Sequence, residues 1–272
     1  MRTLLQLSDI HFGMTDDAVI ASLEMVCRQI NPDVVIISGD LTQRAKVPQF
    51  EAARSFIERI KVCTRVVIAV PGNHDIAPYY RPFARVLHPY DRYNKFIRPV
   101  VEDRYADDEI AIFGITTSRP SRIKDGRISP EATAQACTWF AEQPSAVKIV
   151  VTHHPLALPR GQSSPMLAQG AEEAVNAFEH ADVDIYLSGH LHQSSLVQTS
   201  ERHVRTAHDA LAIQAGTVST RGRGEAQSFN LLRIGKDTVE YLSYLLADPL
   251  VGFTPQQARS FVRENSGWKP VS

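Results

Sequence analysis

The chain has 272 residues, enough to bury the core of one large α/β domain, and its acidic and basic residues nearly balance at a formal net charge of −1. That balance argues against broad electrostatic capture of nucleic acid or an anionic membrane, so a small, specific partner is expected. The opening apolar stretch is too short for a signal peptide, and no stretch approaches the roughly 18 apolar residues of a membrane-spanning helix.

The three cysteines are scattered along the chain. Cys27, Cys63 and Cys137 lack the paired spacing of a zinc ribbon or a redox motif. A reducing compartment suits such a chain, and we expect a cytoplasmic protein.

Strand-like runs alternate with helical periods over the first two thirds of the chain, which predicts β-strands with helices packed outside them. In chain order the predicted strands are Thr3 to Leu7, Val34 to Ile37, Val66 to Val70, Ile110 to Ile115, Ile149 to Thr152 and Ile185 to Leu187. Apolar residues recur at helical spacing between them, first at Leu23, Val26 and Ile30 and then at Phe50, Ala53, Ile57 and Ile60. These helical faces are expected to lie in the core.

From Ser195 the pattern changes to short strands separated by glycine-containing turns, which predicts a second, mostly antiparallel sheet. These strands are expected at Leu211 to Gln214, Phe229 to Ile234 and Val239 to Leu245. We assign residues 1–248 to one domain and residues 249–272 to a polar tail that packs on it, with a helix from Pro255 to Val262. The segment 155–169, rich in Pro, Gly and Ser, is expected to form a loop over the site, either a substrate-contacting lid or a solvated connector.

Five short fragments each end an apolar run with residues that can bind a metal ion. They are Asp9-Ile10-His11, Gly39-Asp40, Gly72-Asn73-His74-Asp75, His153-His154 and Gly189-His190-Leu191-His192. Each fragment alone is as compatible with a turn or a core-edge histidine as with a site. Five of them in this order, each after a strand-like run, indicate one assembled site with enough oxygen and imidazole ligands for two ions.

Local geometry suggests how some of these side chains meet. In an extended backbone, Asp9 and His11 lie on the same face and can share an ion. The glycine before Asp40 lets the backbone turn sharply, so that this carboxylate can bridge two cations. Strand alternation allows only one of His153 and His154 to face the same side.

The order Asp-x-His, Gly-Asp, Gly-Asn-His-Asp, His and Gly-His-x-His resembles the calcineurin-like metallophosphoesterase superfamily, over residues 8–192. The stretch Gly39-Asp40-Leu41-Thr42 is similar to the bacterial branch that contains class III cyclic-nucleotide phosphodiesterases and glycerophosphodiesterases. Many members of that branch have an Asp next, where this chain has Gln43. The resemblance implies a four-layer α-β-β-α sandwich, in which two mixed sheets are flanked by helices.

Matched motif by motif, the resemblance implies two metal ions that share the Asp40 carboxylate. One ion would be held by Asp9, His11, Asp40 and His192, and the other by Asp40, Asn73, His153 and His190, which makes His154 the less favoured of its pair. His74 would stabilise the developing charge or protonate the leaving oxygen, and Asp75 would support it. Imidazoles, carboxylates and an amide without a thiolate suit Mn, Fe, Zn or Co.

The leading expectation is a dinuclear-metal-dependent phosphodiesterase, which hydrolyses a cyclic nucleotide or a small glycerophosphodiester by attack of a metal-bridging hydroxide. The alternatives are a phosphomonoesterase acting on a small phosphorylated substrate and a catalytically silent scaffold, although the complete ligand set argues against the latter. Arg221 and Arg223, in a loop after the last motif, are candidate substrate-binding residues. We interpret Arg119, Arg122, Lys124 and Arg127 as solvated surface and His88, His180, His203 and His208 as ordinary histidines.

Overall fold

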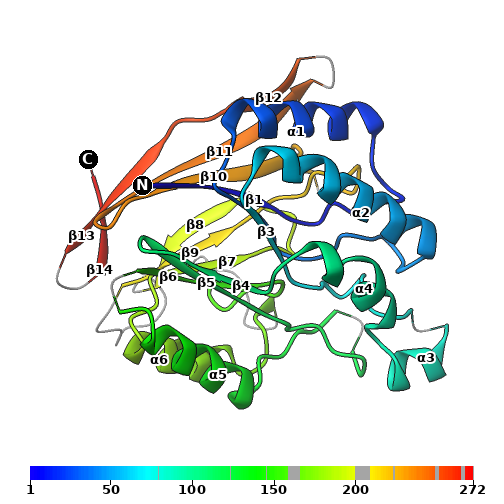
Figure 1. Ribbon diagram of the computed structural model, residues 1–272, viewed down its shortest axis with the longest axis horizontal. Helices are drawn as coiled ribbons and strands as arrows, with labels where there is room; N and C mark the ends of the chain where they lie inside the picture. The colour runs from blue at the N-terminus through cyan, green and yellow to red at the C-terminus, as the bar shows by residue number, and fades with distance from the viewer. Residues whose placement is uncertain are drawn as a thin grey trace.

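The computed structural model describes residues 1–78, 80–122, 124–144, 146–158, 166–199, 209–222, 224–248, 251–264 and 267–271. These residues form two β-sheets that lie face to face, with helices against their outer faces (Figure 1). Each sheet contains both parallel and antiparallel strand pairs. The predicted sandwich of two mixed sheets flanked by helices is therefore confirmed.

The first sheet has the strand order β14-β13-β11-β10-β1-β2-β3, and β12 pairs with β11. Its strands are β1 (Arg2–Leu7), β2 (Val34–Ile37), β3 (Val66–Ala69), β10 (Ser228–Ile234), β11 (Thr238–Asp248), β12 (Gly252–Pro255), β13 (Arg259–Glu264) and β14 (Gly267–Pro270). Its outer face is covered by α1 (Asp17–Ile30), α2 (Val47–Ile60), α4 (Asp91–Phe96) and the short helices η1 (Lys61–Cys63) and η2 (Arg98–Val100).

The second sheet has the strand order β4-β5-β6-β7-β9-β8. Its strands are β4 (Arg104–Ala106), β5 (Ile110–Ile115), β6 (Val147–Thr152), β7 (Ile185–Ser188), β8 (Ser195–Gln198) and β9 (Leu211–Gln214). Its outer face is covered by α5 (Pro130–Ala141) and α6 (Ala171–His180), while the short α3 (Pro82–Leu87) stands apart at one side (Figure 1). None of the helices that the structure describes has the length and apolar character needed to cross a membrane.

The strands are apolar on both faces because both faces are buried. In β2, Val34 and Ile36 belong to the core between the two sheets, whereas Val35 and Ile37 belong to the core beneath α1 and α2. In the second sheet, Ile112 contributes to the same central core. Both faces of each sheet are thus packed, and some of the few buried polar side chains within the strands bond to one another, as Asn230 does to Gln6 at 3.0 Å.

The prediction of a separate antiparallel sheet after Ser195 is wrong. β8 and β9 join the second sheet beside β7, whereas β10 and β11 join the first sheet beside β1. β10 runs antiparallel to β1, and Leu4 pairs with Leu232. The sequence has no local pattern that predicts this pairing, because β1 and β10 are far apart along the chain. Which strands pair depends on which sheet edges remain uncovered after the helices have packed.

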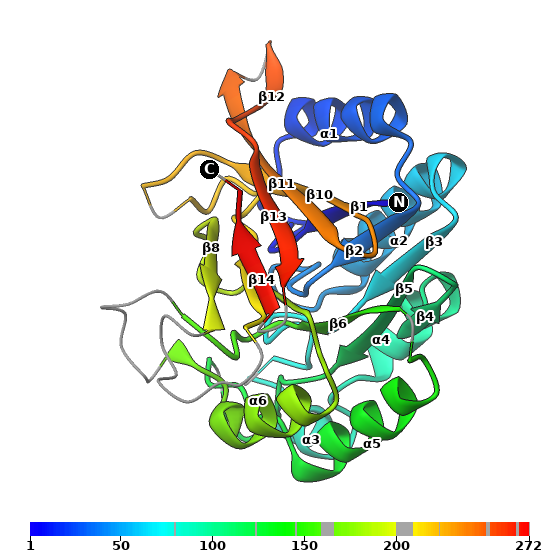
Figure 2. The same ribbon diagram turned by 90° about the vertical axis from the view of Figure 1, so that its left-hand side faces the viewer.

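The helix predicted from Pro255 to Val262 is also wrong. β12 ends at Pro255, β13 begins at Arg259, and both strands pair antiparallel with β11. β13 and β14 lie toward the viewer at the edge of the first sheet (Figure 2). Strands are favoured over a helix here because strand pairing buries Phe261 and Trp268 in the core between the sheets.

The assignment of residues 249–272 to the same domain as residues 1–248 remains a prediction that Trp268 can test. Its side chain is fully buried, with the Arg263 guanidinium 4.5 Å from the ring centroid. Trp268→Ala is expected to lower the free energy of unfolding by about 3–5 kcal/mol, because it leaves a large cavity between the sheets. Urea denaturation measures this loss, and Val271→Ala, at a half-exposed neighbour, is the control. Equal midpoints for the two variants would mean that the tail does not stabilise the domain.

Candidate metal centre

The five motif fragments follow the C-terminal ends of five strands. β1, β2 and β3 are neighbouring parallel strands of the first sheet, and β6 and β7 are neighbouring parallel strands of the second. In α/β proteins, side chains that follow the carboxyl ends of parallel strands meet in a common crevice. The structure brings the predicted ligands together at such an edge, and most of them are buried.

The backbone at these ligands is left-handed rather than extended. The φ angles are 51° at Asp9, 53° at His11, 53° at Asp40, 74° at His190 and 61° at His192. The argument from an extended backbone at Asp9 and His11 is therefore wrong, although the two side chains do converge. Non-glycine residues in this region cost roughly 1–3 kcal/mol each, and such strain typically marks functional sites.

Asp40 lies between two groups of ligands. Its Oδ1 accepts a hydrogen bond from the backbone N–H of His74 at 2.8 Å, which orients the carboxylate. Its Oδ2 lies 3.7 Å from His11 Nε2 and 3.5 Å from His153 Nε2. One oxygen thus faces ligands of both predicted ions, which is the arrangement of a carboxylate that bridges two ions through a single oxygen.

The first group consists of Asp9, His11 and His192. Asp9 Oδ1 lies 3.7 Å from His11 Nε2 and 3.1 Å from His192 Nε2. The other oxygen, Oδ2, accepts hydrogen bonds from the Ser8 hydroxyl at 2.6 Å and from the His190 N–H at 2.9 Å. Asp9 Oδ1 itself is buried without a hydrogen-bond partner among the described residues. A buried carboxylate oxygen that faces imidazole nitrogens without a hydrogen bond fits a metal ligand.

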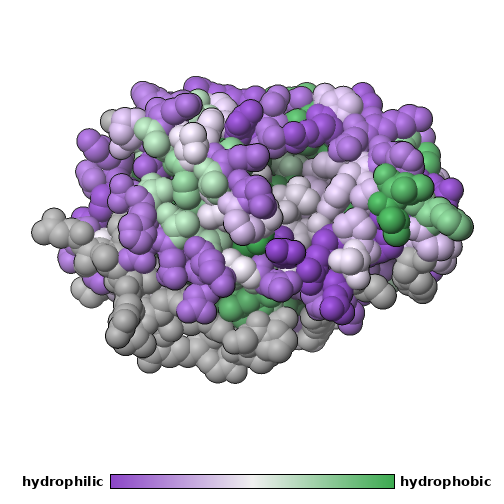
Figure 3. Space-filling model, turned by 90° about the horizontal axis from the view of Figure 1, so that it is seen from below, coloured by the Kyte–Doolittle hydropathy of each residue, from purple (hydrophilic) through white to green (hydrophobic). Residues whose placement is uncertain are grey.

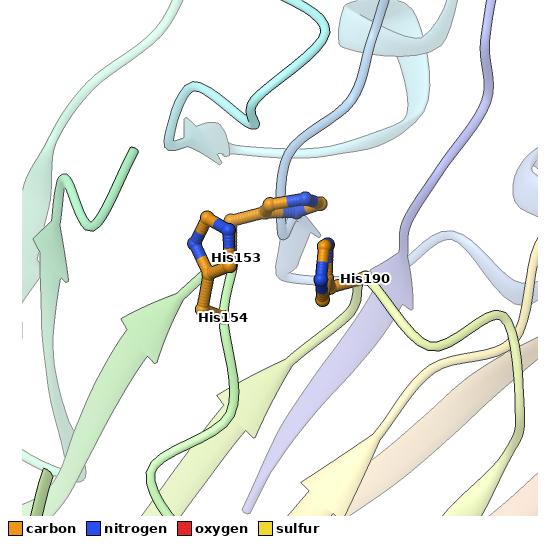
Figure 4. Close-up of side chains that lie close together, drawn as sticks. All are labelled: His153, His154 and His190. Carbon is orange, nitrogen blue, oxygen red and sulfur yellow. The ribbon is translucent and has the colours of Figure 1, made fainter. Parts of the chain in front are cut away.

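The second group forms where β6 and β7 end. The rings of His153, His154 and His190 gather there (Figure 4), and they offer ligand atoms within 4.8 Å of one another. His153 Nε2 also lies 3.2 Å from the Asn73 side-chain oxygen. The structure thus brings His153, His190 and Asn73 together, and His153 connects them to Asp40.

Hydrogen bonds select the free nitrogen of two predicted ligands. His153 Nδ1 donates to the Ser38 carbonyl at 2.8 Å, and His192 Nδ1 donates to the Arg221 carbonyl at 3.1 Å. Each ring then presents the lone pair of Nε2 to the site. A carbonyl that holds the far ring nitrogen is the usual second contact of a metal-binding histidine.

His154 differs because both of its ring nitrogens have hydrogen-bond partners outside the centre. Nε2 donates to the Lys124 carbonyl at 2.8 Å, and Nδ1 accepts from the Thr117 hydroxyl at 2.9 Å. Its ring still lies against His190, with the centroids 4.4 Å apart. These contacts support the expectation that His154 is not a ligand and packs beside the predicted ligand His190.

The electrostatics of the centre favour cations. Burial opposes the ionisation of Asp9 and Asp40, yet the neighbouring imidazoles, with His153 foremost at Asp40, hold the pKa of both carboxyls below its ordinary value. Burial likewise opposes the charging of His153, but Asp40 and Asp9 raise its pKa to about 9. The donor set, the lone oxygen of Asp9 and this charge balance all fit a pair of metal ions, which would compete with protons for the same nitrogens.

His74 lies beside the centre and faces an open cavity of about 310 Å³. Its Nδ1 donates to the Gln43 carbonyl at 2.7 Å, and its Nε2 lies 3.3 Å from Nη1 of Arg221. The same Arg221 nitrogen donates to the Gln43 side-chain oxygen at 3.3 Å. Of the two predicted substrate-binding arginines, Arg221 thus lines the cavity, whereas Arg223 lies outside the described residues.

Asp75 is buried beneath the loops that carry Asp40 and His74. Its carboxylate accepts hydrogen bonds from the backbone N–H groups of Leu41, Thr42 and Gly72 and from the Thr42 hydroxyl, at 2.7–3.0 Å. Burial, with a contribution from the Asp40 charge, raises its pKa to about 6. Asp75 therefore ties the loops after β2 and β3 together, while the ring nitrogens of His74 face Gln43 and Arg221.

The remaining sequence candidates fall in several places. Lys124, interpreted as plain surface, is exposed but lines the cavity. His88 and His180 are exposed, as expected for ordinary histidines, and His203 and His208 lie outside the described residues. In the loop 155–169, the Ala168 N–H donates to the Pro155 carbonyl at 2.9 Å and closes the base, while the central residues 159–165, where a lid would lie, are outside the described residues.

Sequence reasoning missed Arg85. Its buried guanidinium donates to the carbonyls of Ala77, Pro120 and Arg122 at 2.6–2.8 Å, which joins three segments of the cavity wall. It lies on the short α3 and follows no motif, so no local signal identifies it. Ser8, which holds Asp9, was identifiable from its place directly before the first motif.

Exposed hydrophobic residues gather on and beside α3. Figure 3 shows a hydrophobic patch at its right-hand edge. The exposed large side chains of α3 are Phe83, Val86 and Leu87, and Tyr80 is exposed beside them. Tyr80 also lines the cavity, together with Ile76 and Pro78. The apolar part of the cavity wall is thus continuous with this exposed patch.

The sequence of this chain is similar to proteins of known family. The family described as calcineurin-like phosphoesterase matches residues 2–194. A cAMP/cGMP dual specificity phosphodiesterase from Mycobacterium tuberculosis is 27% identical over an alignment that covers 96% of this chain and 86% of that protein.

Two solved structures have a similar fold. A dimetal phosphatase from Danio rerio superposes with a TM-score of 0.61 at 12% identity, covering 88% of this chain and 95% of that one. A purple acid phosphatase from yellow lupin (Lupinus luteus) seeds gives a TM-score of 0.62 at 13% identity, covering 95% of this chain and 53% of that one. At these identities the likeness shows the fold alone.

Proposed function

Because the chain belongs to the calcineurin-like phosphoesterase family and is a metal-dependent phosphoric ester hydrolase, we propose that it hydrolyses phosphodiesters, with a cyclic nucleotide or a small glycerophosphodiester as substrate. The observation that carries this proposal is the position of Asp40 Oδ2 between His11 and His153, beside a cavity that His74 and Arg221 line. The full-length similarity to a cyclic-nucleotide phosphodiesterase supports a diester over a monoester.

We assign one ion to Asp9, His11, Asp40 and His192 and the other to Asp40, Asn73, His153 and His190. Both sets combine imidazole with oxygen ligands, which supports Mn, Fe, Zn or Co as the metals. When bound, the two ions would lower the pKa of a water molecule and polarise the phosphoryl oxygens. The three cysteines carry free thiols although Cys27 Sγ lies only 3.2 Å from Cys63 Sγ, and a reduced pair of neighbouring thiols supports a cytoplasmic location.

His74 and Arg221 act on the substrate in this proposal. The Gln43 carbonyl holds the proton on His74 Nδ1, so Nε2 is the atom that takes up a proton and passes it to the leaving oxygen. The Arg221 guanidinium, held by the Gln43 side chain, pairs with a non-bridging phosphoryl oxygen. The apolar wall of Ile76, Pro78 and Tyr80 accommodates an organic ester group.

Arg221→Ala is expected to raise KM about tenfold or more, since it removes a charge-assisted hydrogen bond to the phosphate. Arg221→Lys keeps the charge but loses the planar fork, so it should recover only part of that loss. Steady-state kinetics with bis(p-nitrophenyl) phosphate separate KM from kcat. An unchanged KM in Arg221→Ala would remove this residue from the substrate site.

The proposed function is tested by a panel of metals and substrates. The apo-protein is loaded separately with Mn, Fe, Zn and Co, and kcat/KM is measured for cyclic nucleotides, glycerophosphodiesters and phosphomonoesters. Asp40→Asn protein, purified in parallel, reports any contaminating phosphatase. We expect diesters to be preferred with at least one metal. A preference for monoesters by more than about tenfold, or about 1.4 kcal/mol of transition-state stabilisation, would overturn the diesterase proposal.

A further inference from the structure

The cavity beside the candidate metal centre has an unusual charge. Four residues that line it are basic, namely Arg44, Arg85, Lys124 and Arg221, and none of its described lining residues is acidic. The chain as a whole has 30 acidic and 29 basic residues, so this wall departs strongly from the average surface. Like charges that share a cavity repel one another, and an anionic ligand would relieve that repulsion.

Two of these basic residues already have partners. Arg85 donates to three backbone carbonyls, and Arg221 contacts Gln43 and His74. Arg221 is therefore placed for the phosphoryl group that reacts. Arg85 supplies a buried positive charge that no carboxylate among the described residues pairs with within 4.0 Å.

Arg44 and Lys124 differ because, within the part of the chain that the structure describes, their side chains have neither a hydrogen bond nor an ion pair. Their backbones are nevertheless held in place. The Arg44 N–H donates to the Gln49 side chain at 2.9 Å, and the Lys124 carbonyl accepts from His154 Nε2 at 2.8 Å. Because His154 also packs against His190, one residue connects the loop of Lys124 to the candidate metal centre.

We propose that Arg44 and Lys124 form a second anion-binding subsite, which takes a phosphate group of the substrate other than the one that is cleaved. The substrate class is then a phosphodiester that carries an additional phosphate, such as a nucleotide phosphorylated at a second position. This inference rests on the proposed phosphodiesterase function. A guanidinium and an ammonium group together suit phosphate, since one supplies a planar fork and the other a mobile point charge.

A matched pair of chromogenic diesters tests the subsite. Thymidine 5′-(p-nitrophenyl phosphate) carries one phosphate, and the same compound with a 3′-phosphate carries two. We expect the wild-type protein to favour the second compound in kcat/KM by about tenfold or more, the effect of one charge-assisted hydrogen bond. In the double variant Arg44→Gln, Lys124→Gln that ratio should fall to about one. Arg81→Gln removes an exposed charge that does not line the cavity, and it should keep the wild-type ratio.

A binding measurement keeps the two proposals separate. Calorimetry with thymidine 3′,5′-bisphosphate and thymidine 5′-phosphate, on metal-loaded wild-type and double-variant proteins, reports the subsite without turnover. If both diesters are cleaved with equal kcat/KM, or if the double variant keeps the preference, the subsite is wrong while the diesterase function stands. If neither diester is cleaved, the diesterase function fails, and equal affinity of the wild-type protein for the two ligands then overturns the subsite as well.

Discussion

Asp40→Asn protein is expected to lose one or both metal equivalents and to lose activity by about a thousandfold or more, because the negative charge that joins the two ligand groups is removed. The substitution keeps an oxygen that can accept the His74 N–H, so the local backbone should survive. What disappears is the charge on the oxygen that faces His11 and His153. Elemental analysis of the purified protein and kcat/KM on a diester measure the two effects.

The matched control is Asp108→Asn, which removes the same charge from an exposed carboxylate that pairs with Arg2. Circular dichroism and thermal unfolding of both variants establish that each is folded. Asp40→Asn protein that is folded and still holds two metal equivalents would contradict the role of Asp40 as a bridge. Full metal content with little activity would instead place Asp40 in catalysis alone.

His74→Ala protein is expected to keep both metal ions and to lose about 10²- to 10⁴-fold in kcat, the range for removal of a general acid. The backbone N–H that holds Asp40 remains in this variant, and His74 belongs to none of the ligand clusters among the described residues. Loss of its ring removes the group that faces Arg221 in the cavity. The measurement is kcat with a poor leaving group such as an alkyl ester, for which protonation matters most.

Two comparisons make the His74 result specific. A p-nitrophenyl diester, whose leaving group needs little protonation, should be affected less than the alkyl ester if His74 is the acid. His88→Ala, at an exposed histidine, should change neither value. Equal losses on both substrates would favour stabilisation of charge on the phosphoryl group over proton transfer, and an unchanged kcat would exclude His74 from the reaction.

This chain has Gln43 where many members of the similar bacterial branch have an Asp, and the contacts of Gln43 explain why the site tolerates this difference. Its backbone carbonyl holds His74, and its neutral side chain accepts from Arg221. A carboxylate at the same place would neutralise the Arg221 charge that a substrate phosphate needs. The amide instead orients the guanidinium and leaves its charge available.

The sequence by itself determined the types of the candidate ligands, their order and the strands that precede them. Runs such as Val34 to Ile37 are apolar on both faces, which predicts a buried strand. A motif begins where each run ends, so one short stretch of sequence predicts both the strand and the candidate ligand that follows it. The resemblance over residues 8–192 then indicated metal-dependent hydrolysis of a phosphoester, because five fragments in that order are far more specific than any one of them.

Only the tertiary structure decided how the ligands converge. Five candidate ligands adopt left-handed backbone conformations, namely Asp9, His11, Asp40, His190 and His192. Asp and His enter this region more often than most other non-glycine residues, but only packing around the site stabilises it at these positions. The free nitrogen of His153 is set by the Ser38 carbonyl, which directly follows β2 of the other sheet. Such contacts exist only after the two sheets have packed together.

The same limit explains the errors at the C-terminal end and the residues that sequence reasoning missed. The stretch from Pro255 to Val262 reads as a helix, yet it forms strands because the open edge of β11 and the core around Trp268 favour pairing. Lys124 reads as surface, yet its loop turns toward the cavity because His154 holds its carbonyl. Local pattern specifies elements and ligands, whereas long-range packing decides which sheet a strand joins and which side chains reach the substrate.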